Sequence, residues 1–348
     1  MLVLQAERRS TAERTRMEKI RGFQDVVGHR DIISHMQNAI RLNKVSHAYI
    51  IGGEEGSGKN MLANLFAMTL QCKEGGTEPC MKCISCKKAL SGNHPDIIRV
   101  THEKPNSIGI DDIRMQLVND VTIRPYESPR KIYIVDEAEK MTPQAQNALL
   151  KTIEEPPGYA TILFLSDNPG LFLQTITSRC VMLKLKPVSD QAVREYLVKE
   201  LHVPDYQAEI QASFARGIIG RAIKMAESQE FNELTQNALR LLKQSKDMEV
   251  YELVDAIKSM TADKQNVYQY LELFTMWFRD VLLFKATKEV DDLIFKAEIN
   301  YIKERASVSS YRGLEAILEA IRVAETRLHA NVNFDLTMEL LFLSIREN

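Results

Sequence analysis

The chain has 348 residues, of which 45% are hydrophobic and 26% charged, so it can form about two to three domains with buried cores. The 45 basic and 47 acidic side chains give a formal net charge of −2, which excludes the global positive charge that attracts nucleic acid. No apolar run approaches the roughly 18 residues that a membrane span needs, and the first residues lack the apolar core of a secretory signal. We therefore expect a cytoplasmic protein, with a flexible arm at residues 1–16.

In residues 17–187, short apolar runs alternate with helical patterns, which is typical of a parallel α/β sheet. The predicted strands are Ala48–Ile51, Asp96–Val100, Ile132–Val135, Thr161–Ser166 and Cys180–Leu185. Helices are predicted at Asn60–Leu70 and Pro143–Glu155. Thr142 is a suitable N-cap for the second helix, and proline is well suited to a first helical turn.

After residue 187 the strand signals largely disappear, so the fold class is α/β plus all-α. Residues 188–230 are predicted to form a small helical unit, and residues 231–348 a separate helical domain. The longer predicted helices there are Val250–Met260, Val267–Ala286, Leu314–His329 and Phe334–Ile345.

A phosphate loop is predicted directly after the first strand, in the sequence Gly53-Glu54-Glu55-Gly56-Ser57-Gly58-Lys59-Asn60. It fits the pattern G-x-x-x-x-G-K, in which backbone N–H groups surround a phosphate and the lysine supplies charge. The candidate nucleotide-binding residues are Gly53, Gly56, Ser57, Gly58, Lys59 and Asn60. Asn60 replaces the hydroxyl residue that normally coordinates Mg²⁺, so we expect binding of ATP or ADP with Mg²⁺ but little hydrolysis. The alternative is a glycine-rich turn without a ligand.

The strand Ile132–Val135 ends in Asp136 and Glu137. In P-loop enzymes the first acid at this place orients Mg²⁺ and the second polarises the attacking water, so both are candidate catalytic residues. A charged surface turn after a buried strand is the alternative, but the preceding phosphate loop makes the catalytic interpretation the stronger one.

Four of the five cysteines, Cys72, Cys80, Cys83 and Cys86, lie within fifteen residues of one another. In a chain without an export signal this spacing favours a metal site over disulfides. Four thiolates suit a closed, structural, tetrahedral Zn²⁺ site. An iron–sulfur cluster and four unmetalled thiols are the alternatives. Cys180 is predicted to be a small buried apolar residue.

Several longer segments resemble the bacterial DNA polymerase III clamp-loader AAA+ family, in the right order over most of residues 20–230. These are Phe23–His29, Val45–Tyr49, Val135–Met141, Asn147–Pro157 and the Ser178-Arg179-Cys180 motif. The resemblance implies a P-loop AAA+ domain with a zinc module at residues 72–86, a helical lid at 188–230 and a helical collar for oligomerisation at 231–348.

The resemblance also implies roles for two arginines. Arg179 would act as an arginine finger, reaching the γ-phosphate held by a neighbouring subunit, because a guanidinium is permanently charged and forks two hydrogen bonds onto phosphate. Arg221 would approach bound phosphate from the lid, and Ser166 or Asn168 would be the first sensor residue. A local carboxylate pair is the alternative for Arg179, and an ordinary surface charge is the alternative for Arg221.

The partners implied are the motor (tau/gamma) and delta subunits, the sliding clamp, and primer-template DNA through the assembled complex, with no membrane. Asn60 and the single helical collar favour a largely non-hydrolysing member that completes its neighbour's ATP site. A hydrolysing motor subunit is the nearest alternative. An independent AAA+ DNA motor and a zinc-containing interaction module with a vestigial phosphate loop are more distant ones.

Overall fold

The computed structural model describes residues 22–244, 257, 260 and 266–348. The chain divides into two compact units. One runs through Ala192 and also includes Arg216–Arg221, and the other contains Val193–Ala215 and the chain from Ala222. The predicted arm at residues 1–16 and most of the predicted helix Val250–Met260 lie outside the described residues.

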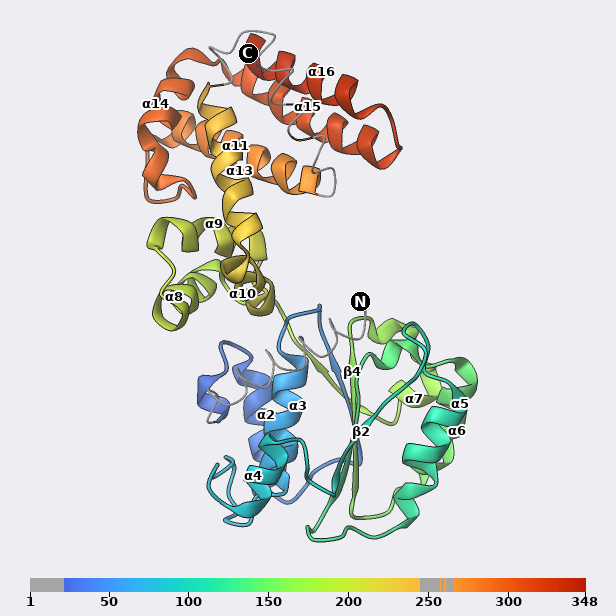
Figure 1. Cartoon of the computed structure of the whole chain (residues 1–348). Coiled ribbons are helices and arrows are strands. Elements are labelled where there is room, and N and C mark those ends of the chain that lie inside the picture. Colours follow the sequence, from blue (N-terminus) through green and yellow to red (C-terminus); the bar gives the residue numbers. More distant parts are fainter. Residues whose placement is uncertain (1–21, 245–256, 258–259, 261–265) are drawn as a thin grey trace. The chain divides into compact units, whose positions relative to one another are not determined.

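The first unit is built on a five-stranded, fully parallel sheet in the order β2-β3-β4-β1-β5 (Figure 1). The strands are β1 (Ala48–Gly52), β2 (Ile97–Val100), β3 (Lys131–Val135), β4 (Ala160–Ser166) and β5 (Val181–Lys184). All residues of β1, β3 and β4 are buried, as expected of parallel strands covered on both faces. The predicted parallel sheet is confirmed, and each strand end differs by at most one residue.

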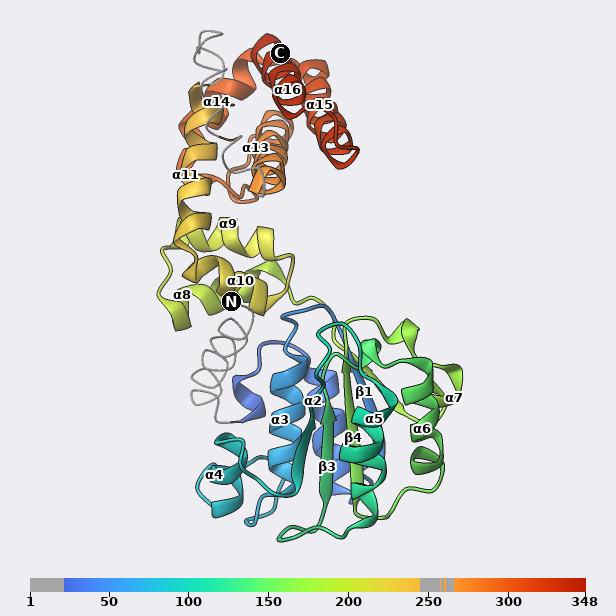
Figure 2. The ribbon, with the colours of Figure 1, turned by 45° about the vertical axis from the view of Figure 1, so that its right-hand side comes forward.

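Helices cover both faces of this sheet (Figure 2). The N-terminal turn η1 (Phe23–Asp25) and the helices α2 (Arg30–Arg41) and α3 (Lys59–Leu70) supply apolar side chains to one core. Side chains of α5 (Ile110–Ile113), α6 (Pro143–Glu154) and α7 (Gln174–Thr177) form the other core. The remaining elements are α4 (Ile84–Leu90), the π-helical turn η2 (Arg114–Val118), and the 3-10 turns η3 (Asp120–Thr122), η4 (Ala138–Lys140) and η5 (Pro169–Leu171).

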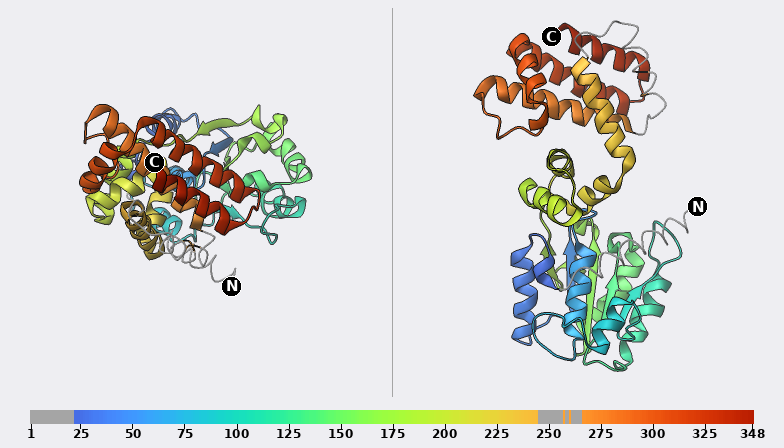
Figure 3. Two further views of the ribbon diagram at one scale, coloured as in Figure 1. Left: turned by 90° about the horizontal axis from the view of Figure 1, so that it is seen from above. Right: turned by 60° about the vertical axis from the view of Figure 1, so that its left-hand side comes forward.

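The second unit is helical in its described part. Two helices, α8 (Asp190–Leu201) and α10 (Ile219–Glu227), begin in the first unit and end in the second. The other described elements of the second unit are α9 (Asp205–Ala215), α11 (Gln229–Gln244), α13 (Val267–Thr287), η7 (Lys296–Glu298), α14 (Ile299–Val308), α15 (Tyr311–His329) and α16 (Phe334–Glu347). Trp277 of α13 is buried in a core that also includes residues of α11, α14, α15 and α16. Figure 3 shows α15 and α16 side by side. No described helix is long and apolar enough to cross a membrane.

Helix α6 begins as its sequence predicts. Thr142 Oγ1 accepts a hydrogen bond of 3.2 Å from the Ala145 N–H, and Pro143 lies in the first turn. Ala145, Leu149 and Ile153 are buried against the sheet. The cap satisfies one of the N–H groups that a helix start leaves without an intrahelical partner.

We expect Thr142→Ala to lower the free energy of unfolding by about 1 kcal/mol, because the Ala145 N–H loses its acceptor. Urea denaturation followed by circular dichroism measures the loss. The exposed Gln144→Ala in the same turn is the control and should leave stability nearly unchanged. Equal effects of the two variants would show that the cap contributes nothing specific.

Candidate nucleotide and metal sites

The phosphate loop lies at a topological switch point of the sheet. Strand β1 pairs with β4 on one side and β5 on the other. The helix after β1 packs on one face, and the helix after β4 packs on the other. Ligands of parallel α/β sheets bind outside the carboxyl ends of the strands at such a point. The segments that follow β1, β3 and β4 therefore meet at one edge.

Lys59, the first residue of α3, points back into its own loop. Its Nζ donates to the carbonyl oxygens of Gly53 at 2.7 Å and Glu54 at 3.0 Å. It also forms an ion pair of 2.5 Å with Asp167 Oδ1. The Lys59 side chain is only 10% exposed, whereas Asp167 is 49% exposed. Sequence reasoning missed Asp167, although its place directly after β4 puts it at the same edge as the loop.

The two polar residues predicted as the first sensor make hydrogen bonds within their own segment after β4. Asn168 Oδ1 accepts from the Gly170 N–H at the start of η5, and Ser166 Oγ accepts from the Asn168 N–H. Asp167, between them, is the residue that contacts Lys59.

Two glycines bring the start of α10 directly onto the loop. The Gly220 N–H donates to the Gly56 carbonyl at 3.0 Å, and Gly56 has a left-handed φ of +83°. A Cβ atom at Gly220 would lie 2.7 Å from Gly56 Cα, so a side chain is excluded there. Next to this contact, Arg221 forms an ion pair of 3.2 Å with Glu54 of the loop. Arg221 therefore lies beside the loop, paired with a carboxylate.

Two further groups line the loop from within the same unit. Ser57 Oγ is buried and has no hydrogen-bond partner, so this hydroxyl is one of the few unsatisfied polar groups of the site. His29 Nε2 lies 3.2 Å from the Ser57 carbonyl oxygen. Burial lowers the pKa of His29, and its hydrogen bond to Ser57 opposes this shift. His29 was not among the predicted site residues.

The carboxamide of Asn60 joins the loop to two strands. Its Nδ2 donates to Asp136 Oδ2 at 2.9 Å, and its Oδ1 accepts from Arg99 at 2.9 Å. Arg99, in β2, also donates to Asn64 Oδ1. Burial raises the pKa of Asp136, and the Glu137 N–H and the Arg99 charge oppose this rise. Arg99, like Asp167 and His29, was not among the predicted site residues.

Glu137 does not join this group through its side chain. Its backbone has a left-handed φ of 48°, and its Oε2 lies 2.6 Å from Lys140 Nζ and 3.8 Å from His102 Nε2. The side chain is 51% exposed. Asp136 and Glu137, which are adjacent in sequence, therefore have separate surroundings.

Arg179 lies at the opposite edge of the sheet, since it comes just before β5, with Cys180 between them, rather than after a strand. Its guanidinium pairs with Glu154 Oε1 at 3.0 Å and donates to the Thr175 carbonyl at 2.9 Å. The Arg179 side chain is 40% exposed and that of Glu154 48%. The local carboxylate pair is thus present, and the arginine is not near its own phosphate loop.

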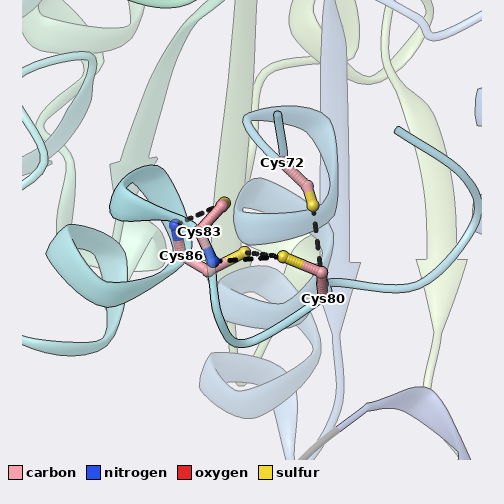
Figure 4. Close-up of side chains that lie close together, drawn as sticks. All are labelled: Cys72, Cys80, Cys83 and Cys86. Atoms are coloured by element: carbon pink, nitrogen blue, oxygen red, sulfur yellow. Dashed lines mark hydrogen bonds between the residues drawn. The ribbon is translucent and has the colours of Figure 1, made fainter. Parts of the chain in front are cut away.

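The four predicted cysteine ligands converge (Figure 4). Their sulfur atoms all lie within 4.8 Å of one another, and Cys80 Sγ and Cys86 Sγ are 3.9 Å apart. Backbone N–H groups of Cys80, Cys83 and Cys86 donate to the sulfurs of Cys72, Cys80 and Cys83 respectively. For Cys83, burial raises the pKa, but the N–H groups of Cys86 and Lys73 and the neighbouring thiols outweigh it and bring the pKa to about 6. The cluster can hold a metal ion.

This cysteine cluster is fastened to the sheet by buried hydrogen bonds. Ser85 Oγ donates to the Gln71 carbonyl at 2.6 Å and lies 2.9 Å from His94 Nε2. Gln71 Nε2 in turn donates to the Asp96 and Arg130 carbonyls, which flank β2 and β3. The position of the cluster is therefore fixed relative to the sheet.

We expect Gly220→Ala to lower the free energy of unfolding by about 1–3 kcal/mol, because the added methyl overlaps the backbone of Gly56. Alanine is otherwise about 1 kcal/mol better than glycine inside a helix, so a net loss identifies the close approach. Gly158→Ala is the matched control, since nothing lies within 4 Å of its added Cβ. Unchanged or increased stability of Gly220→Ala would contradict the close approach.

Known proteins resemble this chain along most of its length. The family model described as "DNA polymerase III, delta subunit" matches residues 28–189. The DNA polymerase III subunit delta' of Bacillus subtilis is 31% identical over 91% of this chain and 95% of its own length. The DNA polymerase III subunit tau of the same organism is 29% identical over 80% of this chain, which spans 53% of that subunit. The tau/gamma subunit of Haemophilus influenzae is 34% identical over 63% of this chain and 33% of its own length. Taken with the phosphate loop on a parallel sheet, this similarity shows that the chain belongs to the AAA+ clamp-loader family of bacterial DNA polymerase III.

Proposed function

We propose that this chain is a delta-prime-like subunit of the clamp loader, which helps to load the sliding clamp on primed DNA and donates Arg179 to the ATP site of a neighbouring subunit. The observation that supports the proposal is that the phosphate loop and Arg179 lie at opposite ends of the strands. The phosphate loop lies at the carboxyl edge of the sheet, and Arg179 lies before β5, where it cannot serve that loop. The alternative, a hydrolysing tau/gamma-type motor, is disfavoured by Asn60 in the metal-binding position.

The surroundings of Arg179 suit an arginine that changes partner. Its ion pair with Glu154 joins two exposed side chains, and exposed pairs of this kind contribute only about 0–1 kcal/mol. A γ-phosphate offers more charge and several acceptor oxygens, and a guanidinium forks onto phosphate. On assembly, the phosphate of a neighbour would therefore replace Glu154 at little cost.

ATP or ADP is the ligand that we propose for the chain's own phosphate loop. Lys59, the unpartnered hydroxyl of Ser57 and the backbone of Gly53, Gly56 and Gly58 would hold its phosphates, with Arg221 approaching from α10. The neighbouring carboxylate Asp136 would orient groups at the loop, and Glu137 would have to leave Lys140 in order to act there.

Zn²⁺ is the metal that we propose for the cysteine cluster. Zinc bound to four thiolates at about 2.3 Å separates neighbouring sulfurs by about 3.8 Å, and Cys80 and Cys86 are already 3.9 Å apart. Four protein ligands leave no open position, so the role is structural. The remaining assignments, a lid at residues 188–230 and a collar at residues 231–348, are part of this proposal. So are partnership with motor and delta subunits and contact with clamp and DNA through the complex.

The metal assignment is tested by elemental analysis of the purified chain. We expect about one zinc per chain, lost in Cys83→Ser. Cys180→Ser is the control, because burial raises the pKa of the Cys180 thiol to about 12 and it lies outside the cluster. Iron with inorganic sulfide, or the same zinc content in Cys83→Ser, would contradict the assignment.

The arginine role is tested by reconstitution with motor and delta subunits. Arg179→Ala should stay folded and lower the clamp-dependent ATPase of the complex, since an arginine finger contributes about 10³-fold or more at the site that it serves. The ATPase of the other sites should remain.

Glu154→Gln is the matched control for that experiment, because it breaks the ion pair and keeps the arginine. It should retain the ATPase. An unchanged ATPase in Arg179→Ala, or an equal loss in Glu154→Gln, would refute the arginine-finger role.

A further inference from the structure

The groups around Asn60 do not match those that hold Mg²⁺ in a phosphate loop. Mg²⁺ requires oxygen ligands at about 2.0–2.1 Å in a near-octahedral shell. A carboxamide has one oxygen, and Asn60 Oδ1 already accepts from Arg99 at 2.9 Å and from Asn64 Nδ2 at 3.3 Å. The other end of the carboxamide is an N–H donor bound to Asp136 Oδ2 at 2.9 Å, and a donor cannot coordinate a cation.

A fixed positive charge occupies the same surroundings. The guanidinium of Arg99 lies one hydrogen bond from the side chain that would touch the metal, and its charge acts on the Asp136 carboxylate. A divalent cation at this place would be repelled by Arg99, whereas phosphate oxygens would be attracted by it.

Arg99 is placed there by the sheet. It lies in β2, opposite Ile134 of β3, and β3 leads directly into Asp136. Its bond to Asn64, one helical turn after Asn60 in α3, holds the guanidinium against the helix that carries Lys59. Strand and helix together fix the charge beside the phosphate loop.

Two other cations beside the loop pair with exposed carboxylates. Lys59 pairs with Asp167, which is 49% exposed, and Arg221 pairs with Glu54, which is 61% exposed. Because both carboxylates are exposed, the phosphates of a ligand can compete with them for the two cations, while Lys59 keeps its bonds to the Gly53 and Glu54 carbonyls. Lys59, Arg221 and Arg99 then supply three positive charges from three different elements.

We propose that the phosphate loop of this chain binds a nucleoside di- or triphosphate without a divalent cation, with the Arg99 guanidinium in place of the metal. This inference rests on the proposed nucleotide binding and specifies its chemistry. It gives a physical reason for a subunit that binds nucleotide without hydrolysing it, because the cation that would neutralise the charge of the reaction is replaced by a fixed side chain.

The test is equilibrium binding of ATP and ADP carrying a fluorescent ribose label to the full-length chain, with excess Mg²⁺ or with EDTA. We expect the same affinity in both media. Arg99→Ala should weaken binding about tenfold in EDTA, which is the loss of one charge-assisted hydrogen bond. Arg114→Ala, an exposed arginine of the same unit, is the matched control and should bind as the unaltered chain does.

If Arg99→Ala does not fold, a second variant tests the same inference. Asn60→Thr combined with Arg99→Gln restores the hydroxyl and removes the charge, so binding should become stronger in Mg²⁺ than in EDTA. Binding by the unaltered chain that requires Mg²⁺ would overturn this inference and leave nucleotide binding intact. No detectable binding in either medium would overturn both, and neither result bears on the role of Arg179.

Discussion

The hydrogen bonds of the Asn60 carboxamide determine the chemistry that the carboxyl edge of the sheet can support. The donor end is bound to Asp136 after β3, and the acceptor end to Arg99 in β2. Asn60 is the second residue of α3, so these two bonds join the phosphate loop to β2 and to the segment that follows β3. A hydroxyl at this position would leave an oxygen for a metal ion. The single oxygen of the carboxamide instead accepts a hydrogen bond from the Arg99 guanidinium.

The parallel sheet also explains how one domain could carry the two functions that we propose. Segments that follow strands lie at one edge, and segments that precede strands lie at the other. The phosphate loop, Asp136 and Asp167 belong to the first group, and Arg179 belongs to the second. In the proposed assembly, a subunit that has lost hydrolysis at one edge still supplies a catalytic group at the other, so the two edges can diverge independently.

The sequence predicts the elements of this structure better than the contacts between them. Five strands, the start of α6 at Thr142 and the convergence of four cysteines follow from local patterns, and all are present. The contacts of Arg99 and Asp167 join residues far apart in the chain. An exposed charge in a short edge strand gives no local signal of such a partner. The Gly220–Gly56 contact was equally hidden, because it depends on how α10 reaches the loop.

We propose that this subunit keeps the outline of an ATPase and has lost its metal-dependent chemistry. The most direct test is the ATP turnover of the isolated full-length chain in excess Mg²⁺. We expect no turnover above the buffer blank, and no change on Lys59→Ala. Robust turnover that is abolished by Lys59→Ala would contradict it, and would identify the chain as a motor subunit instead.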